Sequence, residues 1–243
     1  MAILQTQALS KSFGGIKAVN DCTFEVDEGS ITALIGPNGA GKTTAFNLIS
    51  GLLKPDSGSI TFDGKRIDGQ QPHQITRSGI SRTFQISRDL EEMTLLENLI
   101  VQSPTTGFAD LFKGSILAHE RDHAMELLDF VGITHLAGEK SKNLSYGQKK
   151  LMEFAATLMT EPRLIMLDEP AGGVNPALLE DIMERIELLN KRGITFLIVE
   201  HNMDVVMNLC DPVIVMAYGT VLAKGAPADI QNNEEVLEAY LGN

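Results

Sequence analysis

The chain has 243 residues, 43% of them hydrophobic and 21% charged, which is ordinary for a globular protein and long enough to bury a substantial core. The formal net charge of −12 argues against a nucleic-acid partner, because phosphate backbones are bound through Lys and Arg. No apolar run approaches the ~20 residues of a membrane span and no secretory signal opens the chain, so we expect a cytosolic protein that reaches a membrane only through a partner.

A strand, a glycine-rich loop and a helix follow one another in the first part of the chain. Residues 24–26 alternate like a half-buried strand, and residues 31–35 are mainly apolar, like a buried strand that ends at Gly36. Residues 57–67, SGSITFDGKRI, predict a hairpin about an Asp-Gly turn. From Lys42 onward the apolar residues return with helical spacing, and they are Ala45, Phe46, Leu48, Ile49 and Leu52.

The rest of the chain alternates between strands and helices. GISRTFQ predicts a strand that ends at Gln85, and the segment after it is mainly helical. We then expect a buried strand at PRLIMLDEP, a helix at 176–191, a strand at GITFLIVE, a helix at MDVVMNLC, a strand pair at DPVIVMAYGTVLAKG and a terminal helix at EEVLEAYLGN. This alternation indicates an α/β fold with a mainly parallel sheet wound on both faces.

The domain organisation follows from the absence of linkers. No Gly/Ser-rich or Pro-rich joint separates the helical segment from its surroundings. We therefore predict a single domain over residues 1–243, with a core of 1–85 and 159–243 and an inserted helical subdomain at about 86–158.

The loop GPNGAGKT, Gly36 to Thr43, matches the phosphate-binding pattern G-x-x-x-x-G-K-[ST] between a strand and a helix. Its glycines let successive backbone N–H groups turn toward a phosphate, and the following helix adds the positive end of its dipole. Lys42 can bridge the β- and γ-phosphates, and the Thr43 hydroxyl can bind Mg²⁺. The pattern predicts a nucleoside triphosphate site.

Two carboxylates stand at the end of the buried strand in LIMLDE. Open α/β sheets bind ligands at the carboxyl ends of their strands, so Asp168 and Glu169 should lie beside the phosphate loop if the two strands are neighbours. Asp168 would then hold Mg²⁺ through water, and Glu169 would polarise the attacking water as general base. Without a phosphate loop, a solvated acidic pair would be the better interpretation.

His201 closes the next buried strand in IVEH. A single histidine at a strand end is usually structural, but here a third strand end converges on the same edge of the sheet. We therefore predict that His201 contacts the γ-phosphate. Gln85, at another strand end, could reach Mg²⁺ or the water.

Five motifs in this order, GPNGAGKT, TFQ, NLSYGQ, LIMLDEP and VEH, resemble those of the ATPase subunits of ABC transporters. The resemblance covers essentially the whole chain. It implies a P-loop NTPase core with a mainly parallel sheet, an antiparallel β subdomain and an inserted helical subdomain that carries the signature motif. It also implies an ATP hydrolase with ATP and Mg²⁺ as cofactors.

The resemblance assigns roles to individual residues. Phe13 in KSFGG matches the aromatic that stacks on adenine, Gln85 the Q-loop, Asn175 the D-loop and His201 the switch histidine. The implied catalytic residues are Glu169, His201 and Gln85, and the implied metal ligands are Thr43, Gln85 and Asp168. The signature that faces the partner's ATP is Ser145, Tyr146, Gly147 and Gln148. The nucleotide-binding set is Phe13, Gly36, Pro37, Asn38, Gly39, Ala40, Gly41, Lys42, Thr43 and Thr44.

Three departures from the common pattern narrow the family. Phe13 stands where Tyr is usual, Tyr146 replaces the first glycine of L-S-G-G-Q, and Asn175 replaces the D-loop Asp. With RTFQ, EHNMDVVMNLCD and EAYLG, they make the chain similar to the ATPases of branched-chain amino-acid importers. The ATPases of urea importers and of lipopolysaccharide exporters are similar enough to remain as alternatives.

The resemblance also implies partners. Two subunits, in a homodimer or a heterodimer, would meet head to tail, with each ATP between the phosphate loop of one and the signature of the other. We further expect transmembrane permease subunits, an extracytoplasmic substrate-binding protein, and a place on the cytoplasmic side of the inner (plasma) membrane.

Two weaker alternatives come from other functional classes. A soluble ABC protein acting on nucleic acid or the ribosome would show tandem ATPase units or basic extensions. A P-loop kinase would leave LSYGQ without a role.

Overall fold

The computed structural model describes residues 1–83, 90–103 and 118–241. Its strands are β1 (Ala2–Phe13), β2 (Ile16–Asp27), β3 (Ile31–Ile35), β4 (Ser57–Phe62), β5 (Lys65–Arg66), β6 (Ile80–Arg82), β7 (Leu164–Asp168), β8 (Thr195–Val199), β9 (Val213–Ala217) and β10 (Thr220–Gly225). Its α-helices are α1 (Lys42–Ile49), α2 (Pro72–Arg77), α3 (Leu95–Ile100), α4 (Ala118–Phe130), α5 (Tyr146–Leu158), α6 (Pro176–Lys191), α7 (Met203–Leu209), α8 (Pro227–Gln231) and α9 (Glu234–Leu241).

The larger sheet has the strand order β10-β9-β3-β8-β7-β6. Every neighbouring pair in it is parallel except β9 and β10, which form the predicted strand pair and are antiparallel. The predicted α/β class with a mainly parallel sheet is confirmed. The strands that precede the phosphate loop and the acidic pair, β3 and β7, are not neighbours, because β8 lies between them.

The smaller sheet is antiparallel, in the order β2-β1-β4-β5. The predicted hairpin is confirmed: β4 pairs with β5 through Phe62 and Lys65, around a turn in which Asp63 and Gly64 both have positive φ. Sequence reasoning missed β1. Its register against β2 shifts repeatedly and Ala8 has a φ of 49°, so the strand lacks the clean alternation that identifies a half-buried strand.

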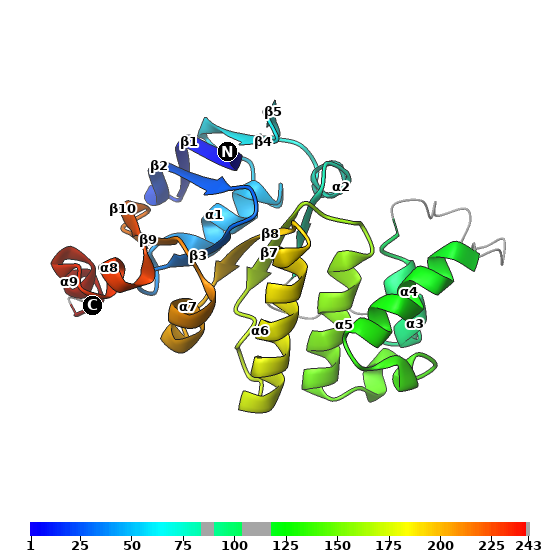
Figure 1. The fold of residues 1–243 in the computed structure, drawn as a ribbon. Helices are drawn as coiled ribbons and strands as arrows, with labels where there is room; N and C mark the ends of the chain where they lie inside the picture. The colour runs from blue at the N-terminus through cyan, green and yellow to red at the C-terminus, as the bar shows by residue number, and fades with distance from the viewer. Residues whose placement is uncertain (84–89, 104–117, 242–243) are drawn as a thin grey trace.

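Two hydrophobic cores lie on opposite faces of the larger sheet. Its strands are buried on both faces, so successive residues alternate between the cores: Leu34 packs toward the smaller sheet, and Ala33 and Ile35 pack toward the helices of the other face. Helix α1 lies between the two sheets (Figure 1), where the Phe46 side chain is fully buried. Because α1 is packed between the two sheets, the position of the phosphate loop that precedes it is fixed.

Helices α3, α4 and α5 lie between β6 and β7 in the chain and gather at one end of the molecule, away from α8 and α9 (Figure 1). The exact limits of the proposed insertion stay a prediction. Among the described residues, no helix combines the length and the apolar character that a bilayer span requires.

One predicted boundary needs correction, and another lies outside the described residues. The helix after the phosphate loop ends at Ile49, so Leu52 is outside it and 37% exposed. Gly51, with a φ of 73°, stops this helix as left-handed glycines commonly do. Strand β6 ends at Arg82, and the predicted strand end at Gln85 falls outside the described residues.

Candidate active site

The phosphate loop connects β3 to α1 and requires glycine at two of its positions. Gly36 and Gly41 have φ angles of 148° and 101°. A Cβ on Gly36 would overlap the carbonyl oxygen of Met216 in β9, and one on Gly41 would overlap that of Ala18 in β2. The loop therefore packs backbone against backbone, and both positions exclude larger residues.

Lys42 lies within this loop, with an exposed fraction of 6%. Its Nζ donates hydrogen bonds to the carbonyl oxygens of Gly36 at 2.7 Å and Pro37 at 3.0 Å. Burial lowers the pKa of Lys42, while the nearby carboxylates of Glu169 and Asp168 act in the opposite direction. β8 separates β3 from β7, so the neighbouring strands on which the prediction depended are not found, although both carboxylates still act on the charge of Lys42.

Asp168 is the last residue of β7 and is only 2% exposed. Its Oδ2 accepts a hydrogen bond from Arg82 Nη2 at 2.8 Å, in a buried ion pair. Nη1 of the same guanidinium donates to Asn47 Oδ1 at 2.8 Å and to Ser50 Oγ at 2.9 Å. Arg82 thereby ties the phosphate-loop helix to the acidic strand end. Sequence reasoning missed Arg82, although an arginine three residues before Gln85 could have suggested a partner for the acidic pair.

Glu169 and His201 lie side by side. Glu169 Oε1 is 3.2 Å from His201 Nε2, and both side chains are partly open to solvent. Glu169 has a φ of 52°, and its N–H donates to the carbonyl of Val199 in β8 at 2.9 Å. The structure thus brings together the two strand ends that the sequence predicted to converge. A solvent-accessible carboxylate beside an imidazole is suited to polarising a water molecule.

Glu200, which sequence reasoning also missed, is a second acid at the end of β8. Its side chain is buried and accepts backbone hydrogen bonds from the loops that follow β7 and β8. The adjacent IVEH motif drew attention to His201, and nothing in the sequence distinguished Glu200 from an exposed acid.

The NLSYGQ segment opens α5. Ser145 is the N-cap, and with Gln148 it forms a capping box: Gln148 N–H donates to Ser145 Oγ at 3.3 Å and Ser145 N–H donates to Gln148 Oε1 at 2.8 Å. Tyr146 is 52% exposed, and its hydroxyl donates to the carbonyl of Gly172 at 3.0 Å. The segment therefore presents an exposed helix N-terminus fastened to the loop after β7.

Other predicted site residues lie around these groups. Asn175 is the N-cap of α6, where its Oδ1 accepts from Leu178 N–H at 2.9 Å. Phe13 ends β1 and is 46% exposed, with the Lys11 ammonium 5.8 Å from its ring centroid. Gln85 lies outside the described residues.

The donor set fits a hard divalent cation. Thr43 offers an exposed hydroxyl in the first turn of α1, and Asp168 offers a carboxylate close enough to Lys42 to affect its pKa. Hydroxyl and carboxylate oxygens are the ligands that Mg²⁺ prefers. These two residues are the ones that would hold the ion.

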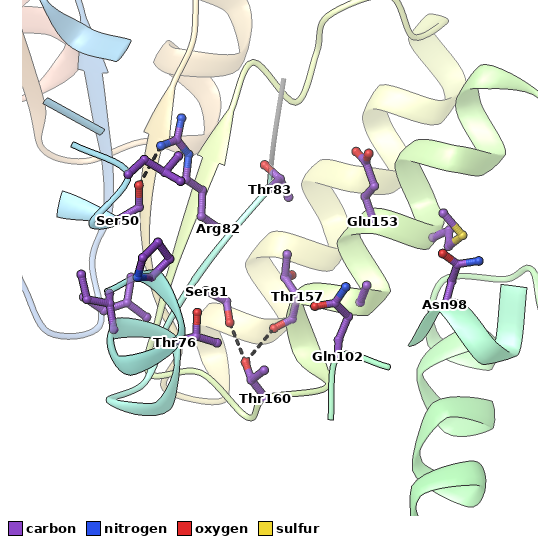
Figure 2. A pocket seen from close by; sticks show the side chains of 16 residues that line it. Ser50, Thr76, Ser81, Arg82, Thr83, Asn98, Gln102, Glu153, Thr157 and Thr160 are labelled. Carbon is purple, nitrogen blue, oxygen red and sulfur yellow. Dashed lines mark hydrogen bonds between the residues drawn. The ribbon is translucent and has the colours of Figure 1, made fainter. Parts of the chain in front are cut away.

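A pocket of about 170 Å³ lies beside this site, between the core and the helical end of the molecule. Figure 2 shows Arg82 and Thr83 on one side of it and Gln102, Glu153 and Thr157 on the other. At its base the hydroxyl groups of Thr160 and Ser81 form a hydrogen bond, with their oxygen atoms 2.6 Å apart. The pocket shares Arg82 with the acidic strand end but is separate from the phosphate loop.

Two family models of ATP-binding cassette transporters match parts of the chain. Residues 19–172 match the family model described as ABC transporter, and residues 220–243 match the model described as branched-chain amino acid ATP-binding cassette transporter.

Two curated relatives match over nearly their whole length. The probable branched-chain amino acid transport ATP-binding protein LivG of Archaeoglobus fulgidus is 46% identical, covering 100% of this chain and 96% of the relative. The high-affinity branched-chain amino acid transport ATP-binding protein BraF of Pseudomonas aeruginosa is 41% identical, covering 99% and 98%.

Solved structures agree with the relatives. The crystal structure of a nucleotide-free ATP-binding cassette from an ABC transporter superposes with a TM-score of 0.90 at 38% identity, covering 100% of both chains. A dimeric post-hydrolysis state of an ATP-binding cassette bound to ADP and Pi superposes with a TM-score of 0.79 at 25% identity, covering 92% of this chain and 98% of the other.

Proposed function

Because the chain belongs to the ABC transporter family, as one of its ATP-binding subunits, we propose that it hydrolyses ATP to drive the import of branched-chain amino acids. The observation that carries the reaction is the convergence of Lys42, Asp168 and the Glu169–His201 pair at one edge of the larger sheet. The cargo is supported by the names of the full-length relatives and by the match of residues 220–243.

The phosphates of ATP bind in the loop from Gly36 to Thr44. Lys42, whose ammonium donates to two carbonyls of its own loop, is placed to bind the β- and γ-phosphates. Phe13 stacks on the adenine through its exposed ring. The N-terminus of α1 adds its dipole to the same phosphates.

Glu169 polarises the attacking water, and His201 orients the Glu169 carboxylate and reaches the γ-phosphate. The 3.2 Å separation of Oε1 and Nε2 supports this division of roles, because a hydrogen bond from the imidazole limits the carboxylate to few orientations. Gln85 is the third catalytic residue that we propose from the motif pattern.

Thr43, Asp168 and Gln85 would hold Mg²⁺, which would supply positive charge beside the phosphate oxygens. Arg82 Nη2 donates to Asp168 Oδ2 and so keeps this carboxylate in place at the end of β7.

The signature segment serves a second subunit. Ser145 and Tyr146 are exposed at the N-terminus of α5, where the first turn presents backbone N–H groups. In a head-to-tail dimer these groups face the γ-phosphate on the partner, and Asn175 faces the same interface. The dimeric relative with ADP and Pi supports this assembly.

Transmembrane permease subunits place the protein on the cytoplasmic side of the membrane. The pocket shown in Figure 2 is where we place the contact with a permease, because it lies between the core and the helical end and shares Arg82 with the catalytic edge. An extracytoplasmic binding protein completes the importer and, with the permeases, selects the cargo.

The test has two parts. A coupled assay on the purified protein should find ATP-dependent release of Pi with no phosphorylated product, and a phosphorylated small molecule would instead favour a kinase. Vesicles that contain the chain with its co-purifying permeases, with ATP enclosed and the binding protein added outside, should then accumulate leucine, isoleucine or valine. Uptake of urea, or export of lipopolysaccharide, would contradict the proposed cargo.

A further inference from the structure

Glu200 is a buried acid that directly follows β8, and both oxygens of its carboxylate accept hydrogen bonds from backbone N–H groups. Its exposed fraction is 3%. Oε1 accepts from Ala171 N–H at 2.7 Å, and Oε2 accepts from His201 N–H at 2.8 Å and Asn202 N–H at 2.9 Å. An ionised carboxylate is acceptor-only, and such bonds to it are stronger than neutral ones.

These donors belong to two loops that are far apart in sequence. Ala171 lies two residues after Glu169 in the loop that follows β7, whereas His201 and Asn202 begin the loop that follows β8. The two strands are parallel neighbours, and Asp168 pairs with Val199. The Glu200 carboxylate therefore joins the loops at the point where the Glu169–His201 pair forms.

Contacts at both ends extend this connection. On one side Asn202 caps α7, with its Oδ1 accepting from Asp204 N–H at 3.0 Å. On the other side Gly172, the neighbour of Ala171, accepts the Tyr146 hydroxyl at 3.0 Å. Hydrogen bonds at Glu200 and at Tyr146, joined by the peptide bond between Ala171 and Gly172, thus link the loop of His201 to the signature helix of the same chain.

We propose that Glu200 is a positioning residue for ATP hydrolysis, which holds the loops of Glu169 and His201 in register and sets the placement of the loop from Ala171 to Asn175. This inference rests on the proposed ATPase function. Glu200 does not touch the nucleotide itself, because its side chain is buried and both oxygens are bonded to backbone N–H groups.

A glutamine at this position would turn an amide NH₂ toward one of the backbone donors, so one side of the junction would open while the shape of the side chain is kept. A small misplacement of catalytic groups slows chemistry strongly, on the order of 10²-fold for 1 Å. Nucleotide binding depends on the phosphate loop, which Glu200 does not contact through any of these three bonds. The expected effect is on kcat rather than on affinity.

The experiment compares Glu200→Gln with Glu120→Gln in the full chain. Glu120 is a matched control, since it is 5% exposed on α4 and accepts from the Ser103 hydroxyl at 2.9 Å. Glu200→Gln should lower kcat for ATP by about tenfold or more, with KM and the affinity for ADP little changed. Glu120→Gln should retain the wild-type kcat. Equal losses in the two variants, or a fall in affinity that matches the fall in kcat, would overturn the proposal.

A double-mutant cycle with His201 measures whether the loss of kcat in Glu200→Gln depends on His201, which a purely structural role of Glu200 would not require. If Glu200 acts through the placement of His201 against Glu169, Glu200→Gln should cost much less in a His201→Ala background than in the wild type. Fully additive losses would contradict the proposal. Should the glutamine variant fail to fold, Glu200→Asp, which keeps the charge but shortens the reach, is judged by the same criteria.

The activity of the wild-type protein distinguishes failure of the proposed ATPase function from failure of the role proposed for Glu200. A folded wild type without ATPase activity would contradict the proposed function. An active wild type with an equally active Glu200→Gln variant would contradict only the role of Glu200.

Discussion

Arg82 and Asp168 form a buried ion pair, with Nη2 and Oδ2 2.8 Å apart and side chains that are 7% and 2% exposed. The two residues lie on neighbouring parallel strands, β6 and β7, and the guanidinium also stacks 5.3 Å from the centroid of Phe46 in α1. One cation therefore holds three elements around the proposed metal-binding carboxylate. It also lines the pocket where we place the permease.

Arg82→Met should destabilise the protein by about 3–5 kcal/mol, because it leaves the Asp168 carboxylate buried without its cation. Urea unfolding measures the loss. Arg163→Met is the matched control: Arg163 pairs with Glu28 and Asp63, but its side chain is 45% exposed, so about 1 kcal/mol or less is expected. Equal effects of the two substitutions would contradict the structural role given to Arg82.

Comparing Gly36→Ala with Gly39→Ala distinguishes the steric overlap of an added Cβ from the cost of a positive φ in the phosphate loop. Both glycines have positive φ, but a Cβ on Gly36 would overlap Met216 O, whereas one on Gly39 meets nothing within 4 Å. Gly39→Ala should cost about 1–2 kcal/mol of strain and keep the fold. Gly36→Ala should destabilise the protein clearly more, or abolish folding, because its Cβ also meets the Met216 carbonyl. Thermal melting measures both, and equal melting temperatures of the two variants would contradict this difference.

Ser145→Arg tests the signature at the dimer interface. The new charge at the exposed N-terminus of α5 should leave nucleotide binding by the monomer nearly intact while abolishing ATP-dependent dimerisation and hydrolysis. Gln231→Arg, exposed at the end of α8, adds the same charge far from α5 (Figure 1) and should hydrolyse ATP normally. Analytical ultracentrifugation with ATP follows dimer formation, and a fully active Ser145→Arg variant would refute the role of the signature.

Asn175→Ala should cost about 1 kcal/mol of stability, because it removes the side-chain cap of α6. Asn175→Asp keeps the capping oxygen and adds a negative charge at the helix N-terminus, so stability should stay the same or rise slightly. Urea unfolding distinguishes the two. A loss as large in Asp as in Ala would show that the cap is not what Asn175 contributes to stability.

The phosphate loop and the strand ends that carry Asp168, Glu169 and His201 were predictable, because each follows a short apolar strand and obeys a local pattern. The strand order was not, since nothing local shows that β8 separates β3 from β7. Arg82 pairs with a residue 86 positions away, and Glu200 binds Ala171 29 positions away. Such partners depend on tertiary packing: the position of Arg82 before Gln85 gave only a hint, and nothing local pointed to the partners of Glu200.

Some secondary-structure elements and boundaries were mispredicted because local irregularities of the backbone are not visible in the spacing of apolar residues. The shifted register of β1 obscured a strand of 12 residues, and a left-handed Gly51 ended α1 before Leu52, although the apolar spacing continued. In the NLSYGQ segment, the motif identified Ser145, Tyr146, Gly147 and Gln148, but the capping box between Ser145 and Gln148 and the contact between Tyr146 and Gly172 emerged only from the structure.

Glu169→Gln removes the proposed general base of ATP hydrolysis while keeping the shape of the side chain beside His201. Pi release and the oligomeric state are measured with ATP by an enzymatic phosphate assay and by light scattering after size exclusion. We expect a loss of turnover on the order of 10²–10⁴-fold, retained ATP binding, and accumulation of an ATP-bound dimer. Turnover at the wild-type rate in the Glu169→Gln variant would contradict this expectation.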